Sequence, residues 1–322
     1  MRPFSSQLLL GAVAAAAGAL AATLLLSRQK KVNPTPTHQA EPFAVPAESS
    51  WEGRCVVVTG ASSGIGRACA VLFARLGARV VIHYSASADG ARETLALCER
   101  ARPSGQGCSD YSILCADFAV AENLEVSASA LVNDATSFFG RAPDSLVLNH
   151  GIFETNSFEQ PSLGAFLSSW RRMMTINSDA PAALTYAFAQ KHLAGVTRSV
   201  EPPAAVASVI VVGSRGALRG EPNSLAYGSS KASAHALAQN TALALGSFGI
   251  VGAAIAPGFV ATRMARFADK AVETSVCAQS PWNRVATPEE VARAVEFAAR
   301  YWENAWLSGA ILNLNGASFL SR

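Results

Sequence analysis

The feature that most constrains the fold is a repeated alternation of short apolar runs with longer amphipathic segments. The apolar runs are rich in β-branched residues and almost continuous, as expected of strands covered on both faces. They occupy residues 54–59, 79–84, 111–116, 145–149, 207–213, 250–256 and 310–314. The segments between them repeat apolar residues every three or four positions, which is typical of helices. Strands alternating with helices predict one α/β domain with a doubly wound parallel sheet of about seven strands.

A separate hydrophobic segment precedes this domain. Residues 8–26 carry no charge and, as a helix, would span about 28 Å, close to the hydrocarbon thickness of a bilayer. More positive charge follows the segment than precedes it, which places the large domain on the cytosolic side. We therefore predict a retained single-pass membrane anchor, with the endoplasmic reticulum favoured over the mitochondrion. A cleaved organellar presequence and a secretory signal are the alternatives.

These patterns divide the chain into three parts. Residues 1–31 form the predicted anchor or targeting segment, and residues 32–50, which are rich in proline and polar side chains, form a linker. Residues 51–322 form the α/β domain, whose ligands should lie beyond the carboxyl ends of its strands.

Charge and cysteine usage exclude two classes of function. The formal net charge is +3, and Lys and Arg are scattered along the domain, so we expect no nucleic-acid partner. The six cysteines form no C-x-x-C pair and no metal-ligand spacing with histidine, so we expect reduced thiols and no metal site.

A glycine-rich turn follows the first apolar run. The sequence TGASSGIG places glycines at Gly60, Gly64 and Gly66, immediately before a helical pattern. Glycines allow a sharp turn and bring backbone N–H groups close to a diphosphate at the start of a helix. The turn alone is equally consistent with a tight strand–helix connection.

A tyrosine and a lysine share one face of a predicted helix. Tyr227 and Lys231 are four residues apart in AYGSSKASAHALAQNTALAL. A nearby ammonium favours the phenolate, so Lys231 is expected to lower the pKa of Tyr227 towards a range useful for acid–base catalysis. Without further residues, the same spacing would also fit a surface pair.

Several motifs in a fixed order resemble the short-chain dehydrogenase/reductase family. They are TGASSGIG, the Asn-His-Gly sequence at residues 149–151, YGSSK and PGFVAT, and the likeness covers about residues 51–317. The resemblance implies a Rossmann-type sheet and a nicotinamide cofactor. Two positions depart from the family pattern, because His150 stands where alanine is usual and Ala256 where asparagine is frequent.

The resemblance also implies the site residues. Ser214 and Tyr227 would bind the substrate oxygen, with Tyr227 as proton donor, while Lys231 and a water held by Asn177 would return the proton. For Asn177, a helix amide that satisfies the backbone is the alternative. Cofactor contacts are implied for Gly60, Ser62, Ser63, Gly64, Ile65, Gly66, Tyr84, Asp117, Asn149, Gly151, Tyr227, Lys231, Pro257, Gly258, Val260 and Thr262.

The end of the second predicted strand favours NADP(H) over NAD(H). An acidic residue there would bind the ribose 2′-hydroxyl of NAD, but Tyr84 occupies that position and no carboxylate follows before Asp89. A 2′-phosphate would therefore meet no repulsion.

Together these features predict an enzyme that transfers a hydride between NADP(H) and a carbonyl or alcohol. The motifs most resemble 3-oxoacyl-carrier-protein reductases, so the expected substrate is a 3-oxoacyl thioester or a similar lipophilic ketone. The predicted anchor keeps open a membrane-bound steroid or retinoid reductase, and, from another class, a non-catalytic NADP-binding membrane protein. The family resemblance also implies a homo-oligomer, either a dimer or a tetramer.

Overall fold

The computed structural model describes residues 50–103, 110–194, 204–265 and 269–320. They belong to one compact unit, Pro46–Arg322. The predicted anchor at residues 8–26 and nearly all of the linker lie outside the described residues, so both stay predictions. Within the described ranges, no helix is both long and apolar enough to cross a membrane.

A seven-stranded parallel sheet forms the centre of the domain, in the order β3-β2-β1-β4-β5-β6-β7. The order reverses between β1 and β4, as in a doubly wound Rossmann-type fold, so the predicted fold class is confirmed. Each predicted apolar run matches one strand, and β6 extends one residue beyond its run. The strands are β1 Cys55–Val58, β2 Arg79–Tyr84, β3 Tyr111–Cys115, β4 Ser145–Leu148, β5 Ala207–Val212, β6 Ile250–Pro257 and β7 Ile311–Leu314.

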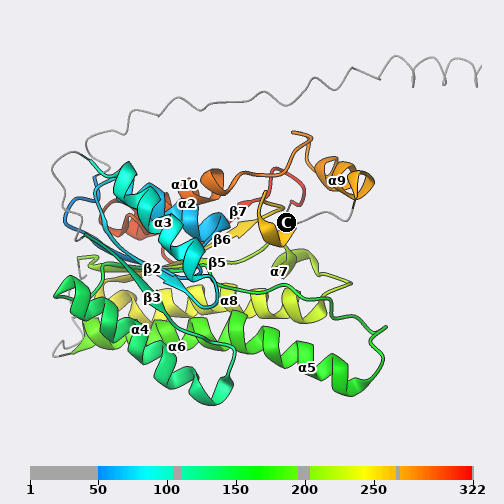
Figure 1. The fold of residues 1–322 in the computed structure, drawn as a ribbon, viewed down its shortest axis with the longest axis horizontal. Helices are drawn as coiled ribbons and strands as arrows, with labels where there is room; N and C mark the ends of the chain where they lie inside the picture. The colour runs from blue at the N-terminus through cyan, green and yellow to red at the C-terminus, as the bar shows by residue number, and fades with distance from the viewer. Residues whose placement is uncertain (1–49, 104–109, 195–203, 266–268, 321–322) are drawn as a thin grey trace, which may run out of the picture. The chain divides into compact units, whose positions relative to one another are not determined.

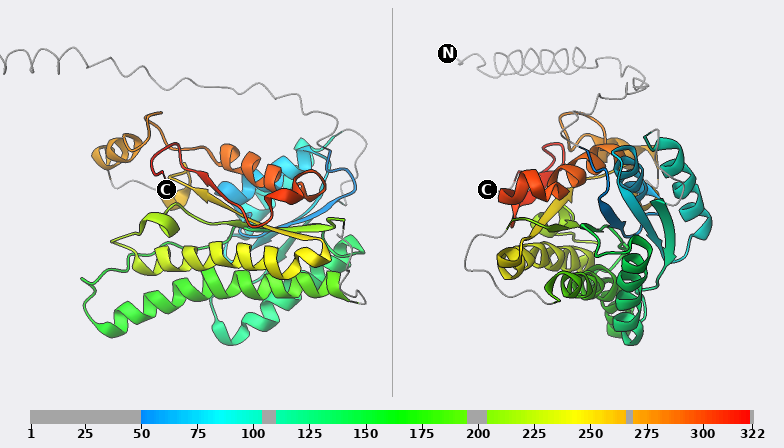
Figure 2. Two further views of the ribbon diagram at one scale, coloured as in Figure 1. Left: turned by 180° about the vertical axis from the view of Figure 1, so that it is seen from behind. Right: turned by 90° about the vertical axis from the view of Figure 1, so that its left-hand side faces the viewer.

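Helices cover both faces of the sheet, and Figures 1 and 2 show the three layers. One face is covered by α2 Gly64–Arg75, α3 Ala88–Ala101 and α10 Pro288–Ala299. The other is covered by α4 Leu124–Phe139, α6 Ala180–Leu193 and α8 Leu225–Leu245. The helix α5 Leu163–Met174 packs against α8. Shorter helices are α7 Gly216–Arg219, α9 Lys270–Cys277 and α11 Tyr301–Asn304.

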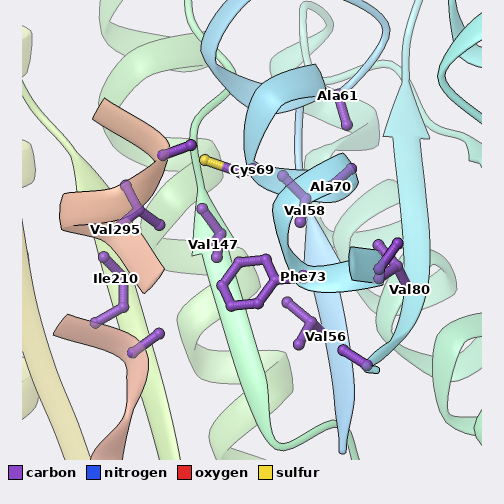
Figure 3. Packing of buried hydrophobic residues seen from close by; sticks show 14 of the residues in the cluster. Val56, Val58, Ala61, Cys69, Ala70, Phe73, Val80, Val147, Ile210 and Val295 are labelled. Carbon is purple, nitrogen blue, oxygen red and sulfur yellow. The ribbon is translucent and has the colours of Figure 1, made fainter. Parts of the chain in front are cut away.

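The core beneath α2 fixes the start of the site. Phe73 of α2 is fully buried among Val56 and Val58 of β1, and Val295 of α10 packs into the same cluster (Figure 3). This packing sets α2 firmly against β1, and therefore fixes the turn that joins them.

All strands run in the same direction, so their carboxyl ends meet at one edge of the sheet. The glycine turn follows β1, the Asn149 segment follows β4, Ser214 follows β5 and Gly258 follows β6. The topology thus gathers residues that are far apart in the sequence at the edge where α/β sheets bind ligands.

Candidate active site

The turn between β1 and α2 is built around glycines for which no other residue fits. Gly60 and Gly64 have φ of +63° and +57°. A Cβ on Gly66 would lie 2.4 Å from the carbonyl oxygen of Gly60, and a Cβ on Gly60 would lie 2.8 Å from the Cα of His150. The backbone is therefore packed too closely for side chains at these two positions.

The N-terminus of α2 can stabilise a bound anion. Its first turn contains no acidic residue, and Ser63 at the N-cap makes no side-chain capping hydrogen bond. N–H groups at a helix start carry partial positive charge and bind phosphates well. Arg263 also approaches this turn, with its Nη2 donating to Ser63 Oγ at 2.9 Å. The glycine turn and this helix start together fit the diphosphate of a dinucleotide.

Asn149 supports the glycine turn from the neighbouring strand. Its Nδ2 donates to the carbonyl oxygens of Thr59 at 2.9 Å and Gly60 at 3.2 Å, and its backbone N–H donates to Thr59 Oγ1 at 2.9 Å. Its side chain therefore holds the shape of the turn, and its cofactor role stays a prediction.

Two histidines also support the turn. The Gly60 N–H donates to Nδ1 of His83 at 3.1 Å, while Nε2 of His83 lies 3.0 Å from the Ala116 carbonyl oxygen, so Nε2 carries the proton. Burial lowers the pKa of His83 to about 4, keeping it neutral. His150 lies edge-on to His83, with its Nδ1 2.8 Å from Thr59 Oγ1. The only sequence signal for His83 was a polar residue in an apolar strand.

The segment after β6 returns to the glycine turn. Gly258 donates its N–H to the Leu314 carbonyl oxygen at 3.0 Å, and Val260 is buried. The Thr262 methyl group lies 3.2 Å from where a Cβ on Gly64 would be. Pro257 ends β6 directly before this segment. The predicted PGFVAT residues are thus brought to the predicted diphosphate site.

Two predicted cofactor residues lie farther along the same edge. Tyr84 ends β2, beside Cys115 of β3, and is half-buried. Asp117 is exposed and accepts a hydrogen bond from the Ala119 N–H at 3.0 Å. In the described residues, neither side chain makes a hydrogen bond to the glycine turn, so their cofactor roles stay predictions. Of the other predicted cofactor residues, Ser62 lies within the glycine turn and Ile65 lies in the first turn of α2.

Ser214 and Tyr227 bring two hydroxyl groups together. The Ser214 hydroxyl, just after β5, lies close enough to Tyr227, near the start of α8, to favour its phenolate. Ser214 Oγ also accepts the Gly216 N–H at 3.0 Å, which orients the serine. The ring of Phe153 packs edge-on against Tyr227, with 5.0 Å between ring centroids. This pair can hold one oxygen atom from two directions.

Lys231 is buried behind Tyr227, one helical turn along α8. Its Nζ donates to the Val212 carbonyl oxygen at 2.9 Å and lies 6.0 Å from the centre of the Tyr227 ring. Burial lowers the pKa of Lys231 to about 8. Gly151 lies beside it, because a Cβ there would be 3.3 Å from the Lys231 Nζ.

The expectation that Lys231 lowers the pKa of Tyr227 is wrong for this arrangement. Burial raises the pKa of Tyr227, the hydrogen bond from Ser214 partly opposes that rise, and Glu221 adds to it. The lysine ammonium instead faces a backbone carbonyl, so the group that does favour the phenolate is Ser214.

Asn177 lies in η4 Thr175–Asp179, a π-helical turn between α5 and α6. Its Oδ1 accepts the Ile152 N–H at 2.8 Å, while Nδ2 donates to the Ile152 carbonyl oxygen at 2.9 Å and to Ser230 Oγ at 3.1 Å. The side chain therefore satisfies backbone groups, as in the alternative considered from sequence. It also ties the segment after β4 to α8, next to Lys231 and Gly151.

Comparisons with known proteins agree with this arrangement. A family model described as enoyl-(acyl carrier protein) reductase matches residues 60–316. The chain is 32% identical to cis-4-hydroxycyclohexanecarboxylate dehydrogenase of Sinomonas cyclohexanicum, over 82% of this chain and 95% of that protein. It is 29% identical to 3-oxoacyl-(acyl-carrier-protein) reductase FabG of Pseudomonas aeruginosa, over 84% of this chain and 100% of that protein.

The fold and the sequence also match a solved reductase. Angucycline C-6 ketoreductase LanV, solved with bound NADP, superposes with a TM-score of 0.71 at 26% identity, covering 84% of this chain and 98% of LanV. The chain therefore belongs to the short-chain dehydrogenase/reductase family and is an NAD(P)-dependent oxidoreductase that acts on carbonyl or alcohol substrates.

Proposed function

We propose that this enzyme interconverts a lipophilic ketone, such as a 3-oxoacyl thioester, and its alcohol, with NADP(H) and with Tyr227 as general acid and base. The pair of hydroxyl groups on Ser214 and Tyr227, beside buried Lys231, carries the proposal. When bound, the nicotinamide supplies or accepts the hydride.

The chain's own residues handle the oxygen and its proton. Ser214 and Tyr227 bind the substrate oxygen and stabilise the negative charge that develops on it. Tyr227 gives its hydroxyl proton to that oxygen during reduction and takes it back during oxidation. Lys231, whose pKa is lowered to about 8, exchanges protons readily near neutral pH and lies one turn behind the tyrosine. Asn177 and Gly151 keep the space around the Lys231 ammonium fixed.

The preference for NADP(H) is supported by the end of β2. Tyr84 stands there in place of a carboxylate, so the site does not repel a 2′-phosphate. Arg67 is already bonded to Glu93, Thr94 and the Ser62 carbonyl oxygen, so it holds the turn to α3. Fluorescence titration of the full-length chain should give tighter binding of NADPH than of NADH. Tighter binding of NADH would reverse the assignment.

The lipophilic substrate is supported by exposed apolar side chains on the segments that form the site. Phe153 packs on Tyr227 and is still 47% exposed, and Met264, two residues after Thr262 in the segment that returns to the glycine turn, is 54% exposed. FabG of Pseudomonas aeruginosa, whose name specifies a 3-oxoacyl substrate, is one of the relatives. A panel of ketones, 3-oxoacyl thioesters, enoyl thioesters and retinoid or steroid ketones would identify the class. Turnover of the enoyl thioesters alone would contradict the proposed reaction.

Replacement of one oxygen atom tests the proposed acid. Tyr227→Phe should lower kcat by about 10²- to 10⁴-fold, because general acid catalysis contributes that much, while NADPH binding is retained. Tyr186→Phe, at a tyrosine that is 69% exposed on α6, is the matched control and should be neutral. Full activity of Tyr227→Phe would remove Tyr227 from the mechanism. A wild type that binds NADPH but turns over no compound in the panel would favour a non-catalytic binding protein.

The membrane assignment is a second part of the proposal. Residues 8–26 are proposed to anchor the chain in the endoplasmic reticulum membrane, with residues 51–322 in the cytosol and the enzyme a dimer or tetramer. The uncharged length of this segment and the positive charge after it support the anchor. After carbonate extraction of cells expressing the full-length chain, the protein should remain with the membranes. Release into the supernatant would indicate a cleaved or unanchored form.

A further inference from the structure

One pocket contains a buried guanidinium whose partners, in the described part of the chain, are all uncharged. Arg215 directly follows Ser214 and is only 3% exposed. Its Nη1 donates to Ser318 Oγ and its Nη2 to Gln279 Oε1, the second at 3.0 Å. Among the described residues, no carboxylate lies within ion-pair distance of Arg215. Buried charges are normally paired, because an unpaired one is costly to remove from water.

The acidic groups nearest to Arg215 are already paired with other arginines. Glu290 lines the same pocket, but Arg284 binds both of its oxygens, at 2.6 Å and 2.8 Å. Glu221 is paired with Arg219 at 3.6 Å. Burial lowers the pKa of Arg215, and the positive charge of Arg219 lowers it further. The negative charge of Glu221 opposes this shift only in part, as expected for a cation whose charge is incompletely balanced.

A second group in the pocket, an amide donor, has no hydrogen-bond partner among the described residues. Asn315, at the end of β7, is 9% exposed and lines the pocket. Its Oδ1 accepts the Phe319 N–H at 3.2 Å, which leaves Nδ2 as the remaining donor. In the described part of the chain, that buried Nδ2 has no hydrogen-bond partner. A buried cation with only neutral acceptors and a buried amide donor with no acceptor, on separate segments of one pocket, indicate a missing anionic acceptor.

The size and walls of the pocket limit what that acceptor can be. The pocket has a volume of about 120 Å³, and Phe259, Val276, Leu314 and Trp282 contribute apolar walls. A dry cavity of about 150 Å³ can hold benzene, so a small ring or a short chain is the right scale. A single guanidinium with one amide donor suits a planar monoanion, whereas the Glu290 carboxylate at the same pocket disfavours a dianion.

We propose that the Arg215–Asn315 pocket binds the carboxylate of a small amphiphilic monocarboxylic acid, beside the proposed catalytic serine. The carboxylate accepts from the Arg215 guanidinium and the Asn315 Nδ2, and the apolar body of the acid lies against Phe259 and Leu314. This site goes beyond the proposed function, and its occupancy does not depend on turnover.

Binding of a matched pair of probes tests the site. Calorimetric titration of the full-length chain in a non-ionic detergent should show benzoate binding at least about tenfold more tightly than the isosteric, uncharged benzamide, because hydrogen bonds to a charged group are the stronger ones. Equal binding of the two probes, or no binding of benzoate, would overturn the proposal.

Asn315→Asp is the decisive variant. It places a carboxylate in the pocket that Arg215 also lines, which supplies the missing acceptor from within the chain and should exclude an external one. Benzoate binding should fall at least about tenfold, with the thermal midpoint unchanged or raised. Asn123→Asp adds the same charge at an exposed, distant position and should leave benzoate binding unchanged. Retention of benzoate binding in folded Asn315→Asp would show that Arg215 is only a structural link to Ser318 and Gln279.

Kinetics then identify the source of the carboxylate. If Asn315→Asp raises KM for a keto acid but not for the corresponding neutral ketone, the pocket holds the substrate's own carboxylate. If both KM values are unchanged while benzoate binding is lost, the ligand is a separate small acid. Both results support the carboxylate site. If no ketone is turned over, the proposed reaction fails, but the calorimetric titration still tests the carboxylate site by itself.

Discussion

Individual polar side chains around the glycine turn act mainly as supports for its backbone. The Asn149 side chain donates a hydrogen bond to a carbonyl oxygen beside the turn, and the His83 side chain accepts one from a backbone N–H group of the turn. The Thr59 side chain accepts one from the backbone of the segment after β4. Because these hydrogen bonds are buried or partly buried, the loss of one partner would leave the other poorly satisfied, at a cost of up to about 1–3 kcal/mol. We therefore expect the affinity for a dinucleotide to depend also on residues that need not contact it.

The closest approach in this turn gives a prediction at the residue scale. Gly66→Ala should weaken NADPH binding more than tenfold and reduce the free energy of unfolding, because the new Cβ would lie 2.4 Å from the Gly60 carbonyl oxygen and 2.5 Å from Asn149 Nδ2. Gly246→Ala is the matched control, since its Cβ would meet nothing within 4 Å and Gly246 has a φ of −58°. Titration of both variants with NADPH checks this. Unchanged affinity in Gly66→Ala would show that the turn can open.

At the scale of elements, the seven strands and the helices between them could be predicted from the sequence, because buried parallel strands are recognisable as continuous apolar runs. The motif residues could also be placed at the carboxyl edge. The roles of Arg215 and His83 could not, because each depends on partners from distant segments, such as Ser318 and Ala116. The direction of the Tyr227 pKa shift was missed for the same reason, since burial depends on tertiary packing.

The packing of α2 on β1 gives a prediction for these elements. Phe73, near the end of α2, is fully buried against Trp51 and β1, so Phe73→Ala should lower the free energy of unfolding by about 3–5 kcal/mol. It should also weaken NADPH binding, because it loosens the helix that carries the glycine turn at its other end. Phe297→Ala, on α10 at a residue that is 42% exposed, should cost much less. Urea unfolding of both variants provides the measurement. Similar losses in the two would contradict the packing described here.

At the scale of the whole molecule, the polar residues of the site are largely buried and neutral. Burial lowers the pKa of both His83 and His235 to about 4, and Lys231 adds to the effect on His235. His235 also accepts the Ser214 N–H at its Nε2, at 3.3 Å, so its neutral form contributes to the geometry of the hydroxyl pair. The fold thus depends on imidazoles that stay uncharged over a pH range in which the unfolded chain would protonate them.

This dependence predicts how stability varies with pH. Above pH 6.5, a histidine is neutral in both the folded and the unfolded chain, so its contribution is constant. Between pH 6.5 and about 4, the unfolded chain binds a proton that the folded chain does not, so stability falls as the pH falls. For His83 the full loss is on the order of 3 kcal/mol. The carboxyl groups of Glu296 and Asp179, whose pKa values burial raises, oppose this trend.

The His83→Asn variant separates the histidine contribution from that of the carboxyl groups. The asparagine amide offers both an acceptor and a donor for the Gly60 N–H and the Ala116 carbonyl, but it does not titrate. The difference in unfolding free energy between wild type and variant, measured by urea unfolding at pH 7.5 and pH 5, should therefore shift in favour of the variant at the lower pH. A pH-independent difference would mean that His83 is protonated equally easily in the folded and unfolded chains, and hence that solvent or a counter-charge reaches the base of the glycine turn.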